Sequence, residues 1–127
     1  MREFKFRAWE TRKRIMIVEE ILTAILWCKE KTPDCIEYND REGLLTTTDF
    51  IIMQWTGLKD KNRVDIYEGD VVEIKEARTI GIVKFENGMF IIEFNSQRLT
   101  LSVVQLHQNI EVIGNVYENN NLIKGDL

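Results

Sequence analysis

Four acidic side chains lie close together in the sequence, and they are the first group that could do chemistry. They are Asp60, Asp65, Glu68 and Asp70. Carboxylates at this density can hold a hard cation or act as a general acid and base. Their spacing does not follow the calcium-loop pattern, which places ligands at alternate positions before a glycine. Because Asp at turns commonly accepts hydrogen bonds from nearby backbone N–H groups, we expect these residues to shape turns and predict no metal site.

A second group lies near the N-terminus, where basic and aromatic side chains are interleaved. Residues 1–14 contain six basic and two acidic residues, so this segment carries +4 and the remainder −8 of a net charge of −4. Cations beside stacking rings are typical of single-stranded nucleic-acid surfaces, but a net negative protein repels phosphate. Three interpretations stay open: a solvated face, an acidic protein surface such as a neighbouring subunit, or nucleic acid. The candidate interaction residues are Lys5, Arg7, Trp9, Arg12, Lys13 and Arg14.

The remaining residues with catalytic or ligating side chains form no known motif. His107 is the only histidine and has no recognisable Ser, Cys or Asp partner pattern, and neither a G-x-S-x-G elbow nor a glycine-rich phosphate loop occurs. Cys28 and Cys35 are too far apart for the C-x₂₋₄-C pair of a zinc site, and we expect them to be reduced thiols. The sequence therefore predicts no cofactor and no enzymatic activity.

The N-terminal pattern predicts a β-hairpin. Phe4, Phe6 and Ala8 alternate with charged residues, which places them on one face of a half-buried strand and predicts that they are core. The basic residues and Trp9 then belong to the opposite face. A polar turn at residues 10–14 leads to a second strand, Ile15–Val18.

The middle of the chain is less regular. Residues 19–27 favour a continued strand, although their apolar spacing also suits a helix. Residues 29–43 contain the only proline and many charges, so we expect a loop or linker there. The short apolar run Phe50–Trp55 predicts a strand that is covered on both faces.

The C-terminal half predicts short strands separated by tight turns. Asn87–Gly88 lies between two apolar runs and is the strongest hairpin signal in the chain. We expect turns or bends at Gly57, Asp60, Asn62, Gly69, Asp70, Asn87, Gly88 and Gly114. The predicted fold is mainly β with little helix: an N-terminal β-hairpin layer (1–55) packed on a C-terminal SH3-like small barrel (56–127).

Four separated segments carry a family resemblance. They are Lys5–Trp9, Met53–Asn62, Ile66–Val72 and Glu111–Asn119. In this order they resemble the YopX family of small proteins from bacteriophages and prophages of Gram-positive bacteria. The chain departs from the family pattern at Arg63, where the family has glycine after Asp-Lys-Asn, and at Asn120 and Asn121, where it lacks the proline that usually follows Glu-Asn. If that glycine needs positive φ, Arg63 is strained or the turn changes type.

The resemblance implies a β-rich phage protein with an SH3-like C-terminal part and possible oligomerisation. It implies no activity and no catalytic residues, because the family is of unknown function. We therefore expect a non-enzymatic accessory protein that binds a protein and self-associates, with nucleic-acid binding through the basic N-terminal edge as the alternative. The chain has no run of about 18 apolar residues and no signal peptide, so we expect a cytoplasmic location and no membrane partner.

Overall fold

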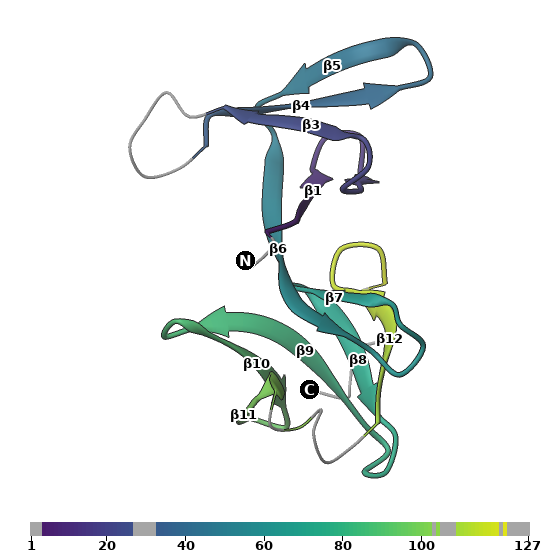
Figure 1. The fold of residues 1–127 in the computed structure, drawn as a ribbon, viewed down its shortest axis with the longest axis vertical. Helices are drawn as coiled ribbons and strands as arrows, with labels where there is room; N and C mark the ends of the chain where they lie inside the picture. The colour runs from purple at the N-terminus through teal and green to yellow at the C-terminus, as the bar shows by residue number, and fades with distance from the viewer. Residues whose placement is uncertain (1–3, 27–32, 103, 105–108, 120, 122–127) are drawn as a thin grey trace. The chain divides into compact units, whose positions relative to one another are not determined.

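The structure is a computed structural model that describes residues 4–26, 33–102, 104, 109–119 and 121 (Figure 1). These residues are mainly β-strand, with a short helical turn at residues 101, 102 and 104. The mainly β fold with little helix is confirmed. The strands are β1 (Phe6–Glu10), β2 (Ile15–Ile17), β3 (Leu22–Leu26), β4 (Cys35–Asp40), β5 (Gly43–Thr47), β6 (Phe50–Lys59), β7 (Asp65–Tyr67), β8 (Asp70–Ile74), β9 (Thr79–Glu86), β10 (Met89–Phe94), β11 (Gln97–Thr100) and β12 (Ile110–Asn115).

Contacts divide the chain into two compact units, Met1–Gln54 and Trp55–Leu127, called unit 1 and unit 2 below. Strand β6 belongs to both. Its first half pairs with β1 in unit 1, and its second half pairs with β7 in unit 2. None of the helical segments among the described residues is long and apolar enough to cross a membrane.

Unit 1 contains the predicted N-terminal hairpin. Strands β1 and β2 pair antiparallel, with Trp9 opposite Met16, and β1 also pairs along its other edge with β6. A separate sheet has the order β3-β4-β5. A hydrophobic cluster forms the core of the unit, and its fully buried members are Ala8, Ile17, Ile36 and Tyr38.

The prediction of a loop at residues 29–43 is wrong for the described part, residues 33–43. Strands β4 and β5 form a hairpin there, because Ile36 and Tyr38 alternate with polar residues and so bury one face. Asp40 closes the turn: its Oδ1 accepts hydrogen bonds from the N–H groups of Glu42 (2.7 Å) and Gly43 (3.1 Å). The charges that suggested a linker lie at this turn and on the solvent face.

Two aromatic residues near the N-terminus also lie differently from the prediction. Phe4 is 62% exposed, because it precedes Phe6, the first residue of β1 that pairs with β6. Trp9 is only 6% exposed, although alternation placed it on the solvent face. Strand β1 lies between β2 and β6, and its last three residues are all buried, so both of its faces are covered there. Alternation predicts burial correctly only where one face of a strand is exposed to solvent. It therefore misassigns residues of a strand that is covered on both faces.

Unit 2 is built on a five-stranded antiparallel sheet in the order β11-β10-β9-β8-β12, which curls into a half-barrel (Figure 1). Strands β9 and β10 are joined by the predicted Asn87–Gly88 turn, with Glu86 opposite Met89. Both turn residues have positive φ (51° and 79°), as a two-residue hairpin loop requires. The buried residues of the core are Ile66, Val72, Ile74, Val83, Ile92, Leu101, Val104 and Ile110.

Candidate functional site

Asp60 is a buried carboxylate that organises backbone. Its side chain is 6% exposed. Its Oδ1 accepts hydrogen bonds from the N–H groups of Asn62 (2.8 Å) and Val64 (2.9 Å), and its Oδ2 accepts one from Val112 (2.9 Å). Asp60 therefore joins the turn after β6 to β12, fifty-two residues later.

The other three acidic residues of this stretch face different partners. Asp70 is buried, and its Oδ2 accepts a hydrogen bond from the N–H of Tyr67 (2.7 Å). Asp65 Oδ1 lies 2.7 Å from Lys59 Nζ. Glu68 lines a surface cavity with Gly69, β9 and Tyr117. Within the described residues, no group of three His, Cys, Asp or Glu side chains could hold a metal ion.

Of the remaining predicted turn residues, Asn62 and Gly69 lie in turns of unit 2, whereas Gly57 and Gly114 lie inside strands β6 and β12, each at a register shift. Asn62 Nδ2 donates to Glu111 Oε1 (3.1 Å). Gly57 and Gly69 have positive φ (85° and 89°). Gly114 lies at a register shift between β12 and β8, where a Cβ would lie 2.6 Å from Asn119 Oδ1. The departure at Arg63 has a visible consequence, because Arg63 keeps the positive φ (66°) that suits glycine.

The predicted basic surface is divided among different surroundings. The Arg14 guanidinium carbon lies 5.9 Å from the centroid of the Trp9 ring, a cation–π arrangement. Arg7 is half-buried in β1 opposite Met53. Arg12 and Lys13 line one cavity and Lys5 lines another. Because Trp9 is buried, the surface lacks the exposed ring on which the nucleic-acid interpretation depended.

Arg12 and Lys13 border a polar cavity of about 400 Å³, called the threonine cavity below. Its walls come from the β1–β2 turn, from β4 and from the end of β5, and its lining residues are Glu10, Arg12, Lys13, Tyr38, Thr46, Thr47, Thr48 and Asp49. Lys13 Nζ lies 3.4 Å from the buried Tyr38 hydroxyl. Arg12 is exposed, and its nitrogen lies 3.7 Å from Asp49 Oδ2.

Glu10 ties the walls of the threonine cavity together. Its Oε1 accepts hydrogen bonds from the N–H groups of Arg12 (2.6 Å) and Lys13 (2.9 Å). Burial acts to raise the pKa of Glu10, but the Lys13 N–H, the Thr47 side chain and the Arg12 N–H together hold that pKa below its ordinary value. The carboxylate is thus ionised and saturated by the protein's own donors, which leaves little of it for a ligand.

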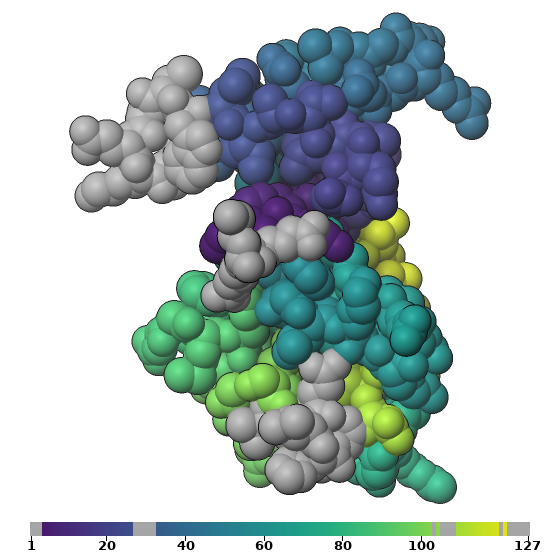
Figure 2. All heavy atoms as spheres, viewed as in Figure 1, coloured from purple at the N-terminus to yellow at the C-terminus, as the bar shows by residue number. Residues whose placement is uncertain are grey.

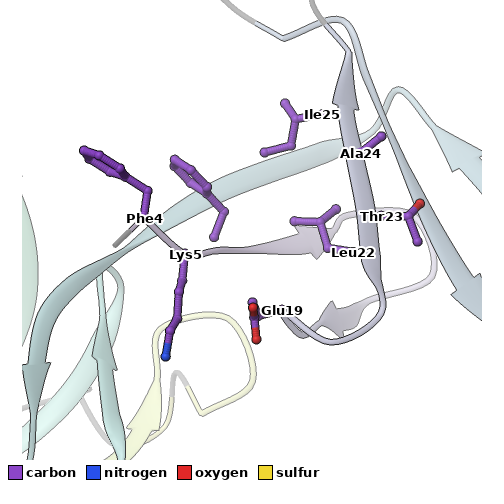
Figure 3. Close-up of a pocket in the computed structure, with 8 residues that line it drawn as sticks. Phe4, Lys5, Glu19, Leu22, Thr23, Ala24 and Ile25 are labelled. Atoms are coloured by element: carbon purple, nitrogen blue, oxygen red, sulfur yellow. The ribbon is translucent and has the colours of Figure 1, made fainter. Parts of the chain in front are cut away.

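Lys5 borders another hollow of unit 1, a groove of about 270 Å³ whose lining is polar and apolar in equal measure (Figure 3); it is called the apolar groove below after its phenylalanine, leucine and isoleucine walls. Its lining residues are Phe4, Lys5, Phe6, Glu19, Leu22, Thr23, Ala24 and Ile25. Phe4 stands on one side, and Leu22 and Ile25 project toward it from β3 on the other side. Lys5 and Glu19 lie at the same end of the groove and give it a polar end. Strand β3 ends its sheet on one side among the described residues, so one of its main-chain edges has no strand beside it.

The apolar groove is the better candidate for a binding site. Large exposed aromatic side chains beside an open apolar hollow are typical of the anchors of protein interfaces. The sequence pattern does not indicate this site, because alternation places Phe4 in the core and leaves residues 19–27 ambiguous between strand and helix. One feature of the sequence does indicate that Phe4 is exposed. Phe4 lies at the very start of the alternating run, before the residues that pair with a neighbouring strand.

Three further candidates for chemistry remain, namely His107, Cys28 and Cys35. His107 and Cys28 lie outside the described residues. Cys35 carries a free thiol and is half-buried in β4.

Comparisons with known proteins bear on the whole chain. The sequence model of the family described as YopX protein matches residues 5–124. The crystal structure of protein EF1440 from Enterococcus faecalis is similar, with 26% identity and a TM-score of 0.73 over 97% of this chain and 99% of that chain. The crystal structure of protein yopX from Bacillus subtilis, at 21% identity, shares the fold with a TM-score of 0.67 over 97% of this chain and 98% of that chain. No curated protein matches the sequence significantly.

Proposed function

The chain belongs to the YopX protein family, and from this membership and the geometry above we propose that it is a non-enzymatic phage or prophage protein that binds a protein partner. The resemblance found in the sequence is confirmed. The proposed contact surface is the apolar groove of unit 1. The proposed setting is the cytoplasm of a bacterial host.

The exposed Phe4 beside the groove is the observation that supports this proposal most. Phe4 is 62% exposed, so a partner that covers its side chain would remove apolar surface from water, which favours binding. The groove beside it offers apolar walls from Phe6, Leu22 and Ile25. An apolar side chain of a partner would fill this space, and Lys5 or Glu19 would contact polar groups at its end.

The proposal that the chain is not an enzyme is supported by how the acidic residues are used. Asp60 and Asp70 direct oxygens to backbone N–H groups, and Asp65 pairs with Lys59. A general acid or base needs a carboxyl group that can reach a substrate. The nucleic-acid alternative has less support, because Trp9 is buried and the basic side chains are divided between two hollows and β1, although Phe4 is exposed beside Lys5.

Selection from a displayed library of random peptides, with the purified chain as target, tests the proposal. We expect enriched peptides with apolar side chains, and a loss of affinity of about tenfold or more in the Phe4→Asp variant. The matched control is Phe85→Asp, since Phe85 is also exposed but lies in unit 2. The proposal is wrong if no peptide is enriched over an unrelated target, or if Phe4→Asp binds the enriched peptides as the wild type does.

A further inference from the structure

The threonine cavity of unit 1 brings two cations and a buried hydroxyl group to one hollow. Arg12, Lys13 and Tyr38 border it together with the three threonines at residues 46–48. Its volume of about 400 Å³ is in the range of pockets that hold small molecules. In Figure 2 the β4–β5 hairpin, which supplies one wall, lies at the surface of unit 1. Arg12 and Lys13 are exposed, so a ligand can reach the cavity from solvent.

The Tyr38 hydroxyl is a buried donor without an acceptor. Tyr38 is 1% exposed. Its oxygen lies 3.4 Å from Lys13 Nζ, and an ammonium group has three N–H donors but no acceptor. The Tyr38 O–H therefore donates to no group among the residues that the structure describes. Because a buried donor without a partner is costly, this position favours a ligand that brings acceptor oxygens.

The carboxylate of Glu10 is engaged elsewhere and holds the two cations in place. Glu10 Oε1 accepts hydrogen bonds from the backbone N–H groups of Arg12 and Lys13. The Thr47 side chain also forms a hydrogen bond with Glu10. These contacts fix the β1–β2 turn, so the side chains of Arg12 and Lys13 extend from an ordered backbone.

Arg12 and Lys13 keep most of their donors for a ligand. The Arg12 guanidinium lies 3.7 Å from Asp49 Oδ2, whereas a direct hydrogen bond between these groups measures about 2.7–2.9 Å. The single contact of Lys13 Nζ with Tyr38 is long as well. A guanidinium has five N–H donors and an ammonium has three. The two side chains can therefore surround an acceptor-only anion.

A phosphate group matches this set of donors. Its oxygens are strong acceptors, and its charge of about −2 at neutral pH equals that of two cations. The net charge of −4 does not prevent binding, because charges beyond about 8 Å are largely screened at physiological salt. Near the cavity the three consecutive cations of residues 12–14 exceed the two carboxylates, Glu10 and Asp49.

We propose that the threonine cavity binds the phosphate group of a small anionic ligand, with Lys13 and Arg12 as the cations and the Tyr38 hydroxyl as a further donor. This inference does not depend on the apolar groove or on the protein partner proposed for it. We expect a dissociation constant on the order of 1 mM or tighter for inorganic phosphate.

Titration of the full chain with inorganic phosphate, followed by backbone amide chemical shifts, tests the site. We expect saturable shifts at residues 10–13 and 46–49, which exceed those caused by sodium chloride at equal ionic strength. Methyl phosphate is the second probe: equal or tighter binding of this ester identifies a phosphorylated small molecule, and preference for inorganic phosphate identifies the free anion. If neither probe gives saturable shifts there by about 10 mM, the proposal is wrong.

Substitution of the cation distinguishes a built site from general attraction of anions. Lys13→Gln weakens phosphate binding by about tenfold. Its control is Arg41→Gln, which removes the same charge from an exposed position in the β4–β5 turn outside the cavity and binds phosphate like the wild type. Equal weakening in the two variants would mean that the cavity is not a specific site, and would overturn the proposal.

Two further variants test the other groups of the cavity. Tyr38→Phe removes only the unpartnered donor, so it weakens phosphate binding by about threefold or more while the chain stays as stable as the wild type in urea. Asp49→Asn removes a negative charge beside Arg12, so it tightens binding by about threefold. Unchanged affinity in Tyr38→Phe, or weaker binding in Asp49→Asn, contradicts the assigned geometry and overturns the inference.

Discussion

Asp60 is an acidic residue that could have been a catalytic or metal-binding group, but its side chain only accepts hydrogen bonds from backbone N–H groups. Three N–H groups from two distant segments converge on one buried carboxylate. Such a group satisfies donors that would otherwise be buried without partners. Its role is therefore visible only when residues 60–64 and Val112 are known to be neighbours, which the sequence alone does not show.

Replacement of Asp60 by alanine should destabilise the chain strongly. The Asp60→Ala variant leaves three N–H groups without their acceptor, and we expect the free energy of unfolding to fall by about 3 kcal/mol. Urea denaturation of the full chain measures this. The control is Glu86→Ala, which removes an exposed ion pair with Arg98 and should cost about 0.5 kcal/mol. Equal losses in the two variants would contradict the role assigned to Asp60.

Arg63 carries backbone strain that glycine would relieve. A non-glycine residue in the left-handed region costs about 1–2 kcal/mol, part of which glycine returns through its greater freedom when unfolded. We therefore expect Arg63→Gly to stabilise the chain by about 0.5–1 kcal/mol. Lys61→Gly, in the same turn but without positive φ, should destabilise it instead. Thermal unfolding of both variants decides; a loss of stability in Arg63→Gly would show that the turn imposes no strain.

Glu10 should make stability depend on pH in the acidic range. Its pKa in the folded chain lies below the ordinary value of 4.5. The stabilisation is therefore fully present above that ordinary value and is lost as pH falls through the lower, folded-state pKa. In Glu10→Gln the free energy of unfolding should fall less steeply between about pH 5 and pH 3. Urea denaturation across this range measures the slope, and an unchanged slope would contradict the assignment.

Among the elements, those with a local turn signal could be predicted from the sequence. The β9–β10 hairpin follows from Asn87–Gly88, and the β1–β2 hairpin follows from alternation and a polar turn. The β4–β5 hairpin could not be predicted, because its turn, Asp40 to Gly43, resembles a charged linker. The burial of Trp9 depends on β6, which is far away in the sequence, and the exposure of Phe4 depends on where pairing begins. Local patterns therefore misassigned Trp9 and Phe4, because the burial of each depends on strand pairing with a segment far away in the sequence.

The close packing of β9 against β10 can be tested by substitution at Gly81. A Cβ on Gly81 would overlap with Ile92 Cγ2 and lie 3.0 Å from the Glu93 carbonyl oxygen. Ile92 is fully buried, so it cannot move aside cheaply. We expect Gly81→Ala to lose about 2 kcal/mol of stability. In the double variant with Ile92→Ala the combined loss should be smaller than the sum of the single losses, as urea denaturation would show; strict additivity would mean that the two residues do not interfere.

For the whole molecule, each unit has its own core, and the proposed contact surface, the apolar groove beside β3, lies in unit 1. Unit 2 contributes the ion pairs on its sheet and the buried carboxylates Asp60 and Asp70.

The most direct measurement of the central claim is a map of backbone amide chemical shifts on titration with an enriched peptide. The account predicts shifts concentrated at residues 4–6, 19 and 22–25, which line the apolar groove, and their loss in Phe4→Asp. Shifts confined to the threonine cavity or to unit 2 would contradict it, and so would a groove that does not respond to any enriched peptide.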